Sequence, residues 1–303
     1  MSTKKIGING FGRIGRQLTK LLLGSKNLEI SAINDLSDSN TSSHLFKYDT
    51  SYGQFDGEVH SNENQLIING EKIQKVSEKE PSKINWSDYD VDIVIESTGI
   101  FTNKSDAEKH LQGTVKKVII SAPATDEDIT IVLGVNDNSY DTKKHNIISN
   151  ASCTTNCVAP MVKVINDKFG IQNALMSTIH SFTNDQSVLD QPHSDLRRAR
   201  TASENIIPTT TGAAKAVVNV IPEMKGKIDG MAYRVPTASV SVTDLSLILE
   251  RDVNVEELNN SLKTASETYL KDIMQYCSDP LVSQDFKGNP NSVIIDSLST
   301  IKT

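Results

Sequence analysis

The sequence predicts an α/β protein with two parts: a doubly wound, mostly parallel sheet over residues 1–151, and an α+β domain with a mostly antiparallel sheet over residues 152–303. Two observations support this. Short apolar segments alternate with helical patterns through the first half, which is typical of βαβ units. In the second half, residues 236–249 alternate with a period of two, which indicates a sheet that buries only one face.

Composition excludes several classes of function. The 303-residue chain is 37% hydrophobic and carries a formal charge of -7, so neither a nucleic-acid-binding nor a membrane-surface protein is expected. No segment approaches the length of a membrane span. Three cysteines make an odd number in a long chain, which does not fit a disulfide framework and favours a reducing, cytoplasmic location.

The first βαβ unit carries a specific motif. A short strand is expected over residues 4–9, followed by G-x-G-x-x-G at Gly10–Gly15 and a helix over residues 16–23. The next strand, over residues 28–35, ends in Asp35 at the usual offset from the glycines. Such glycines let backbone approach a pyrophosphate, and a strand-end carboxylate binds ribose hydroxyls but repels a 2'-phosphate. We therefore predict a Rossmann-like unit that binds NAD; the alternative is a glycine-rich turn without a ligand.

The remainder of the first half continues the alternation. A helix is expected over residues 41–48, and Asn69-Gly70 between apolar segments predicts a hairpin turn. Ser97-Thr98-Gly99 follows a strand and is flexible enough to approach a ligand at the carboxyl edge of the sheet. The further strands are expected over residues 91–96, 116–120, 129–135 and 146–149.

Cys153 lies in the segment Ala151-Ser152-Cys153-Thr154-Thr155-Asn156-Cys157, which precedes a helical pattern. A cysteine at a helix start has a lowered thiol pKa, because the helix dipole and free backbone N–H groups stabilise the thiolate. The alternative is a small buried side chain without chemistry. Cys157 follows one turn later, but C-x-x-x-C is not a usual zinc spacing, so no metal site is expected.

Other candidate residues follow in the second half. His180 ends a strand expected over residues 174–179, and a cysteine–histidine pair is a recurring way to activate a nucleophile. The aperiodic loop 181–203 gathers three arginines, and residues 208–215 form a turn into a helix that is suited to a phosphate. A helix over residues 255–270 and a strand over residues 292–296 complete the prediction.

Five segments together resemble the phosphorylating glyceraldehyde-3-phosphate dehydrogenase family. They are residues 9–16, residues 149–157, the arginine-rich loop, residues 208–215 and Tyr233-Arg234-Val235-Pro236-Thr237. The resemblance runs in order from Lys4 to Thr300, and its cysteine motif is highly specific.

The resemblance implies a role for particular residues. The nucleophile of the family matches Cys153, and its general acid and base matches His180. The inorganic-phosphate site matches Ser152, Thr154, Thr211 and Gly212. The substrate-phosphate site matches Thr183, Asp185, Arg198 and Arg234. Cofactor contacts match Gly10, Phe11, Gly12, Arg13, Ile14, Asp35, Lys79 and Ser121.

The resemblance also implies the reaction and the partners. With NAD as cofactor, a member of this family oxidises glyceraldehyde 3-phosphate through a cysteine thioester, which inorganic phosphate converts into 1,3-bisphosphoglycerate. The family is cytoplasmic, glycolytic and homotetrameric. Its members continue through a final strand and helix that this chain lacks after Thr303, and we expect an incomplete sequence with weakened chemistry. The alternatives are a related phosphorylated-aldose dehydrogenase, for example for erythrose 4-phosphate, and a catalytically weak NAD-binding or redox-sensing protein.

Overall fold

The computed structural model describes residues 3–303, which form two compact units. The first unit contains the chain up to Ile131 together with Ser139–Ala151, and the second contains Val132–Asn138 and Ser152–Thr303. The chain therefore enters the second unit briefly before it returns to complete the first.

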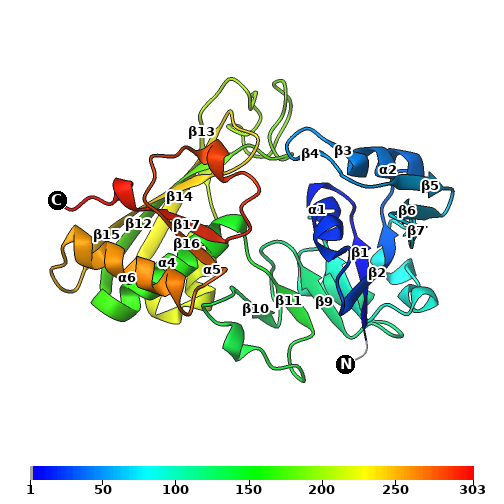
Figure 1. Ribbon diagram of the computed structural model, residues 1–303, viewed down its shortest axis with the longest axis horizontal. Helices are drawn as coiled ribbons and strands as arrows, with labels where there is room; N and C mark the ends of the chain where they lie inside the picture. The colour runs from blue at the N-terminus through cyan, green and yellow to red at the C-terminus, as the bar shows by residue number, and fades with distance from the viewer. Residues whose placement is uncertain (1–2) are drawn as a thin grey trace. The chain divides into compact units, whose positions relative to one another are not determined.

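The first unit is built on one twisted sheet with the strand order β10-β11-β9-β8-β1-β2-β7-β6-β5 (Figure 1). Its strands are β1 Lys4–Asn9, β2 Leu28–Asn34, β5 Val59–Asn62, β6 Gln65–Ile68, β7 Glu71–Val76, β8 Ile93–Glu96, β9 Lys117–Ile120, β10 Ile129–Thr130 and β11 Ile147–Ser149. Its helices are α1 Arg13–Leu22, α2 Ser39–Lys47 and α3 Lys104–Ala107, with a small hairpin of β3 Tyr48–Asp49 and β4 Gly53–Gln54.

The order of the strands indicates which edge of the sheet can bind a ligand. Strands β10, β11, β9, β8, β1, β2 and β7 pair in parallel, whereas β5 and β6 add antiparallel pairs at one side. The chain leaves β1 for β2 and later crosses back to β8 on the other side of β1. The connections reverse direction there, and the carboxyl ends of such strands form the ligand-binding crevice of open α/β sheets.

The second unit is built on a mixed sheet with the order β13-β14-β12-β15. The central pair β12–β14 is parallel and the two outer pairs are antiparallel. Helix α4 contacts β12 and β15, α5 contacts β14, and α6 contacts α4, so helices cover one face of this sheet (Figure 1). The elements are α4 Cys153–Phe169, β12 Ile171–Ser181, β13 Ile207–Thr210, α5 Ala213–Val220, β14 Ile228–Val235, β15 Val242–Leu249, α6 Val255–Glu267, β16 Met274–Cys277 and β17 Val293–Asp296.

The predicted fold class is confirmed, and the differences in detail have local causes. Residues 129–135 give only the short strand β10, because the chain passes into the second unit at Val132. The alternation predicted from residue 236 becomes a strand only from Val242, since Val240 has a left-handed backbone with φ 62°. Strands β13, β14 and β16 were not predicted. Residues 208–210, expected to belong to a turn, lie in β13, and β14 contains Asp229 and Gly230, which are poor strand formers.

Candidate active site

Cys153 is the first residue of helix α4; the residue is accessible to solvent, while the surrounding atoms desolvate its thiol. Ser152 caps the helix, and its Oγ accepts a hydrogen bond from the Thr155 amide at 2.9 Å. The preceding Ala151 has φ 56°, a left-handed conformation that is unusual for a residue with a Cβ. This turn ends the last strand of the first unit and sets the thiol at the positive end of the helix.

His180 lies near the end of β12, and its Nε2 is 3.3 Å from the Cys153 Sγ. Burial raises the pKa of the Cys153 thiol, but the hydrogen bond and charge of His180 and the hydrogen bonds of Thr154 outweigh burial. The pKa is therefore lower than that of an ordinary cysteine. A thiol and an imidazole that are 27 residues apart in sequence thus form a pair suited to a nucleophile and its base.

The other ring nitrogen of His180 has two competing partners. Nδ1 is 2.6 Å from the Ser181 carbonyl oxygen and also 2.6 Å from Arg234 Nη1. A guanidinium can only donate and a carbonyl can only accept, so Nδ1 satisfies one of them at a time. With its proton directed to Ser181, the neutral ring can accept the Cys153 proton at Nε2. With Arg234 bound to Nδ1, the neutral ring carries its proton on Nε2 and cannot accept.

Residues that were not predicted from the sequence hold Ser181. Its Oγ donates to the Val240 carbonyl at 3.0 Å, and its amide donates to Ser241 Oγ at 3.2 Å. Thr237 Oγ1 lies 3.3 Å from the same hydroxyl. The turn over residues 237–241 therefore fixes the carbonyl that faces His180. The sequence does not predict the left-handed φ of Val240, because a valine rarely adopts this conformation.

The arginine-rich loop supplies a second basic group. Arg198 Nη1 donates to Asp185 Oδ2 at 2.6 Å, and its Nε donates to Thr209 Oγ1 at 2.9 Å. His193 Nε2 lies 3.3 Å from the other Asp185 oxygen. Burial lowers the pKa of Arg234, and the positive charge of Arg198 lowers it further. Two such cations near one another favour a bound phosphate.

The remaining predicted phosphate residues lie at two helix starts and in the loop. Thr154 is buried in the first turn of α4, and Gly212 is the N-cap of α5, where the Thr211 Oγ1 accepts the Ala213 amide at 3.2 Å. Thr183 is exposed, and its amide donates to the buried Gln186 side chain at 2.8 Å. Gln186 was not predicted; a buried amide that anchors the loop has no sequence pattern of its own.

The glycine loop of the first unit has the spacing that a bound pyrophosphate requires. Gly10 has φ +95°, and a Cβ there would lie 2.7 Å from the Thr98 amide nitrogen. A Cβ on Gly15 would lie 2.1 Å from the Gly10 carbonyl oxygen, so α1 packs closely on the loop. A Cβ on Gly12 meets nothing within 4 Å, and the first turn of α1 has no side-chain cap. Open space above uncapped N–H groups fits the phosphates of NAD.

Asp35 follows β2, and hydrogen bonds from neighbouring amides fix its carboxylate. The Phe11 amide donates to Oδ2 at 2.7 Å, and the Ser37 amide donates to Oδ1 at 2.9 Å. Burial raises the pKa of Asp35, but the hydrogen bonds of Ser37 and Phe11 and the nearby Lys75 outweigh it and lower the pKa. The carboxylate is therefore charged at neutral pH, as ribose recognition requires.

The other residues expected to contact the cofactor differ in which of their groups can face a ligand. The Phe11 ring is buried and stacks on Phe46, so only its backbone can face a ligand. Arg13 Nη2 lies 3.4 Å from Ser51 Oγ, and Ile14 is exposed. Lys79 is exposed after β7, and the Ser121 amide donates to the Glu96 carbonyl at 3.0 Å.

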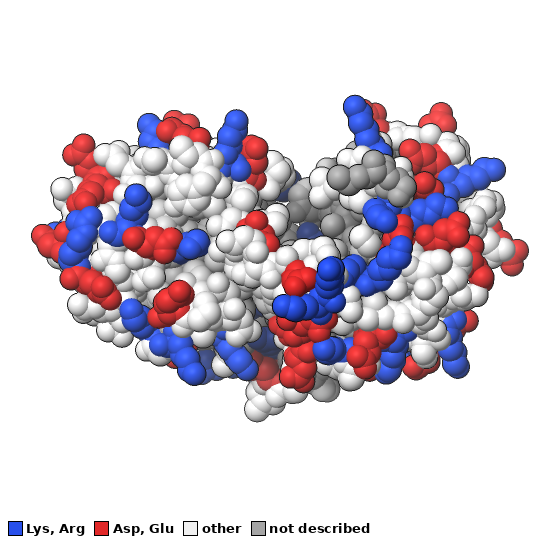
Figure 2. All heavy atoms as spheres, turned by 90° about the horizontal axis from the view of Figure 1, so that it is seen from below, with Lys and Arg blue, Asp and Glu red and all other residues white. Residues whose placement is uncertain are grey.

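Three further observations concern possible metal sites, membrane spans and surface charge. In residues 3–303, no group of three or more histidine, cysteine, aspartate or glutamate residues could hold a metal ion. Over the same range, no helix has both the length and the apolar character to cross a membrane. Basic and acidic side chains are mixed on the face that Figure 2 displays.

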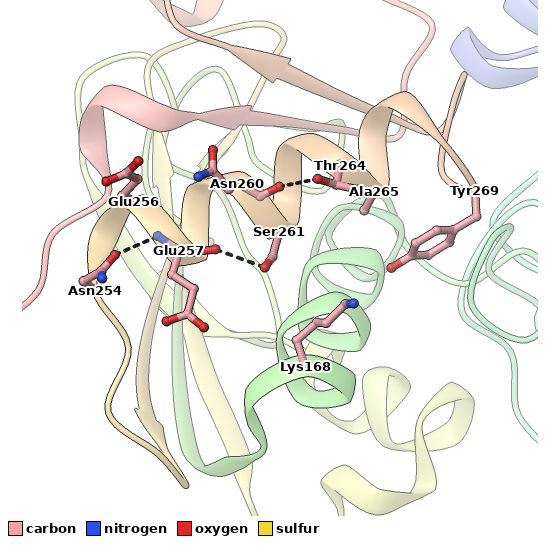
Figure 3. A pocket seen from close by; sticks show the side chains of 9 residues that line it. All are labelled: Lys168, Asn254, Glu256, Glu257, Asn260, Ser261, Thr264, Ala265 and Tyr269. Carbon is pink, nitrogen blue, oxygen red and sulfur yellow. Dashed lines mark hydrogen bonds between the residues drawn. The ribbon is translucent and has the colours of Figure 1, made fainter.

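A pocket of about 450 Å³ lies between the end of α4 and α6 (Figure 3). It is lined by Lys168, Asn254, Glu256, Glu257, Asn260, Ser261, Thr264, Ala265 and Tyr269. Its amide and hydroxyl groups bond mainly to the α6 backbone, as Asn254 does to the Glu257 amide at 2.8 Å. None of the residues expected to act in the reaction lines it.

The dinucleotide loop of the first unit and the thiol–imidazole pair of the second define an NAD-dependent oxidoreductase that acts on an aldehyde. Residues 4–104 match the glyceraldehyde 3-phosphate dehydrogenase NAD binding domain, and residues 152–303 match the C-terminal domain of the same enzyme. The chain belongs to the glyceraldehyde-3-phosphate dehydrogenase family.

Curated relatives extend this similarity over nearly the whole chain. Glyceraldehyde-3-phosphate dehydrogenase 1 of Bacillus cereus is 58% identical over 297 residues, 98% of this chain and 89% of the relative. The Geobacillus stearothermophilus enzyme is 57% identical over the same shares of both chains. The Streptomyces coelicolor enzyme is 55% identical over 301 residues, 99% of this chain and 90% of the relative.

Proposed function

We propose that this protein catalyses the NAD-dependent, phosphorylating oxidation of glyceraldehyde 3-phosphate to 1,3-bisphosphoglycerate, a reaction of glycolysis. The observation that carries the proposal is the 3.3 Å approach of Cys153 Sγ and His180 Nε2 at the start of α4 in a member of this family. The substrate is the one that the names of the relatives give.

Cys153 and His180 perform the covalent chemistry. The Cys153 thiolate adds to the aldehyde carbon and forms a carbon–sulfur bond. The aldehyde oxygen gains the proton that His180 took from the thiol, which gives a hydroxyl. His180 then takes that proton back as the C–H bond breaks, the hydrogen leaves with both bonding electrons, and the carbon becomes a thioester. A phosphate oxygen then attacks the thioester carbon, the carbon–sulfur bond breaks, and the thiolate is regenerated with the acyl phosphate as product.

The basic and hydroxyl groups hold the two phosphates. Arg198 and Arg234, with Thr183, bind the phosphate of the substrate, and Asp185 takes part in that site by holding Arg198. Ser152, Thr154, Thr211 and Gly212 bind inorganic phosphate. A phosphate that takes the Arg234 guanidinium also removes it from His180 Nδ1. That nitrogen is then left to the Ser181 carbonyl, and Nε2 is free to act as a base.

NAD supplies the acceptor for the two electrons when it is bound. Gly10, Gly12 and the first turn of α1 hold its pyrophosphate, and Asp35 holds the adenine ribose. Phe11, Arg13, Ile14, Lys79 and Ser121 complete the binding surface. Residues 1–151 act as the NAD-binding domain, and residues 152–303 as the catalytic and tetramerisation domain.

The outer face of the second sheet supports assembly into a homotetramer, and the proposed place in glycolysis implies a cytoplasmic location. Along β15 the even-numbered residues are exposed, and along β12 and β14 Leu175, Ile179 and Met231 are exposed large hydrophobic residues of the same face. An exposed sheet face that carries several large apolar residues, with Asp244 and Ser246 among them, is suited to another subunit. No observation favours an erythrose 4-phosphate dehydrogenase or a redox sensor.

The test is the variant Cys153→Ser, because serine keeps the shape of the site but is a poor nucleophile at neutral pH. We expect turnover with glyceraldehyde 3-phosphate, NAD and phosphate to fall by about a thousandfold or more, while calorimetric NAD binding stays close to that of the wild type. The matched control is Cys157→Ser, one turn along the same helix, which should remain active. Substantial dehydrogenase activity in Cys153→Ser would overturn the assignment.

A further inference from the structure

Three neighbouring strands of the first unit end in buried polar residues that lie in register. Asn34 ends β2, Asn9 ends β1 and Glu96 ends β8, and Asn9 pairs with both of the others. All three are at most 4% exposed, in strands that are otherwise largely apolar. The reaction described above uses none of these side chains.

Their side chains form one continuous chain of hydrogen bonds. Asn34 Nδ2 donates to Asn9 Oδ1 at 2.7 Å, and Asn9 Nδ2 donates to Glu96 Oε2 at 2.5 Å. We call Asn34, Asn9, Glu96 and the adjoining His110 the polar row. His110 Nε2 lies 3.2 Å from the same Glu96 oxygen, and His110 is fully buried.

The geometry fixes the direction of each donor. Trp86 Nε1 can only donate, and it lies 3.0 Å from His110 Nδ1, so Nδ1 accepts and Nε2 carries the proton. Nε2 therefore donates to Glu96, and its 3.4 Å approach to Asn9 Nδ2 is a contact between two donors. The other Glu96 oxygen accepts from the amide of Thr98 at 2.8 Å and from its hydroxyl. Glu96 thus acts as an acceptor at both oxygens.

The polar row is linked to the loops expected to bind the cofactor. At one end, Asn34 bonds the backbone of Glu78, next to Lys79, at 2.9 and 2.7 Å. At the other end, Glu96 accepts a hydrogen bond from the Thr98 amide. Thr98 packs closely on the glycine loop, since a Cβ on Gly10 would lie 2.7 Å from the Thr98 amide nitrogen. The loop after β8 also binds the glycine loop directly, since Ser97 Oγ donates to the Gly10 carbonyl at 2.7 Å.

We propose that Asn9, Asn34, Glu96 and His110 are positioning residues that hold the loops at the carboxyl ends of β1, β2 and β8 in the NAD-binding conformation before NAD arrives. The proposal rests on NAD binding at this edge. A buried carboxylate that aligns several loops lowers the entropic cost of binding. Damage to the row weakens NAD binding and leaves the chemical step nearly intact once NAD is saturating.

The first test is Thr98→Val, which removes the hydroxyl that bonds Glu96 and keeps the volume of the side chain. We expect the NAD dissociation constant to rise by about tenfold, the loss that one hydrogen bond to a charged group produces, with kcat at saturating NAD within about threefold of wild type. The matched control is Thr114→Val. Its hydroxyl donates to the Val91 carbonyl at 2.7 Å, just before β8 begins at the other end of that strand.

The second test addresses the centre of the row. In Glu96→Gln an NH₂ group replaces one carboxylate oxygen. This donor then faces either the two donors of Thr98 or those of Asn9 and His110. The NAD dissociation constant should therefore rise by more than in Thr98→Val. The double variant Glu96→Gln, Asn9→Asp places a carboxylate oxygen at position 9 opposite the new NH₂ group at position 96. This restores a donor–acceptor pair and should recover part of the affinity for NAD. Emission of Trp86, the only tryptophan of the chain, reports whether its buried site is intact in each variant.

NAD binding is measured directly by calorimetry without substrate, so the result is independent of the chemistry of Cys153. Folded Thr98→Val and Glu96→Gln proteins that bind NAD as tightly as wild type would show the proposal to be wrong. An equal loss of affinity in Thr114→Val, in step with its melting temperature, would also reject it, because the row would then serve general stability alone.

Discussion

Two thiols one turn apart on α4 have opposite environments. Cys153 at the first position gains His180 and the free amides of the helix start, which lower its pKa in spite of burial. Burial raises the pKa of Cys157 to about 11, and a hydrogen bond with Thr243 only partly offsets this effect. The helix therefore presents one reactive sulfur and one inert sulfur, although both residues belong to the same short motif.

This difference predicts the pH dependence of alkylation. A thiol with a lowered pKa is ionised at lower pH, so the rate of Cys153 alkylation by iodoacetamide should reach its plateau below the pH typical of free cysteine. In His180→Gln the main cause of the lowering is lost, and the inflection should move upward by about one pH unit or more. Mass spectrometry of digested protein gives the rate at each site.

The same experiment contains its own controls. Cys157 should remain unlabelled at pH 7 to 8 in both proteins, because so little of it is thiolate at about three pH units below its pKa. An inflection that is identical in wild type and His180→Gln would mean that the helix start alone sets the reactivity of Cys153. Faster labelling of Cys157 than of Cys153 would contradict the geometry of the whole helix start.

The three glycines of the G-x-G-x-x-G motif, two in the loop after β1 and one inside α1, have different roles. Gly10 needs its positive φ and touches the loop after β8, Gly15 lets α1 pack on the loop, and Gly12 alone faces open space. A methyl group at Gly12 therefore costs the fold little, but it occupies the space above the helix start. A methyl group at Gly15 meets backbone that cannot move freely.

The two alanine variants should separate binding from stability. Gly12→Ala should raise the NAD dissociation constant by about tenfold or more and leave the melting temperature nearly unchanged. Gly15→Ala should lower the free energy of unfolding by about 1–3 kcal/mol through overpacking. Calorimetry and thermal unfolding measure the two effects. A Gly12→Ala protein that binds NAD as tightly as the wild type would show that the pyrophosphate of NAD does not bind at this loop.

Sequence patterns predicted the elements whose signals are local. The strand, glycine loop and helix of residues 4–22 and the hairpin at Asn69-Gly70 follow from periodicity and turn chemistry. The turn around Val240 and the polar row at Glu96 did not, because each depends on contacts with segments more than 50 residues away. Hydrogen bonds between distant residues leave no period in the sequence.

The sheet of the second unit has two different faces. Residues 174, 176 and 178 of β12 point to the helices and are buried, whereas Leu175 and Ile179 on the opposite face are exposed. Their in-register neighbours on that face include Val242, and Ile248 lies further along β15. A strand pattern that buries one face and leaves apolar residues on the other indicates a surface for a further chain.

The assembly predicted for this face can be tested with one charged residue. Ile248 is 58% exposed in the single chain, and Ile248→Asp places a carboxylate where a tetramer would bury an apolar side chain. We expect light scattering coupled to size exclusion to give a tetramer for wild type and smaller species for Ile248→Asp, because an unpaired buried charge is costly. Leu21→Asp is the matched control: Leu21 is 78% exposed on α1 in the other unit and should keep the wild-type mass. A tetramer that survives Ile248→Asp would mean that the subunits meet on another surface.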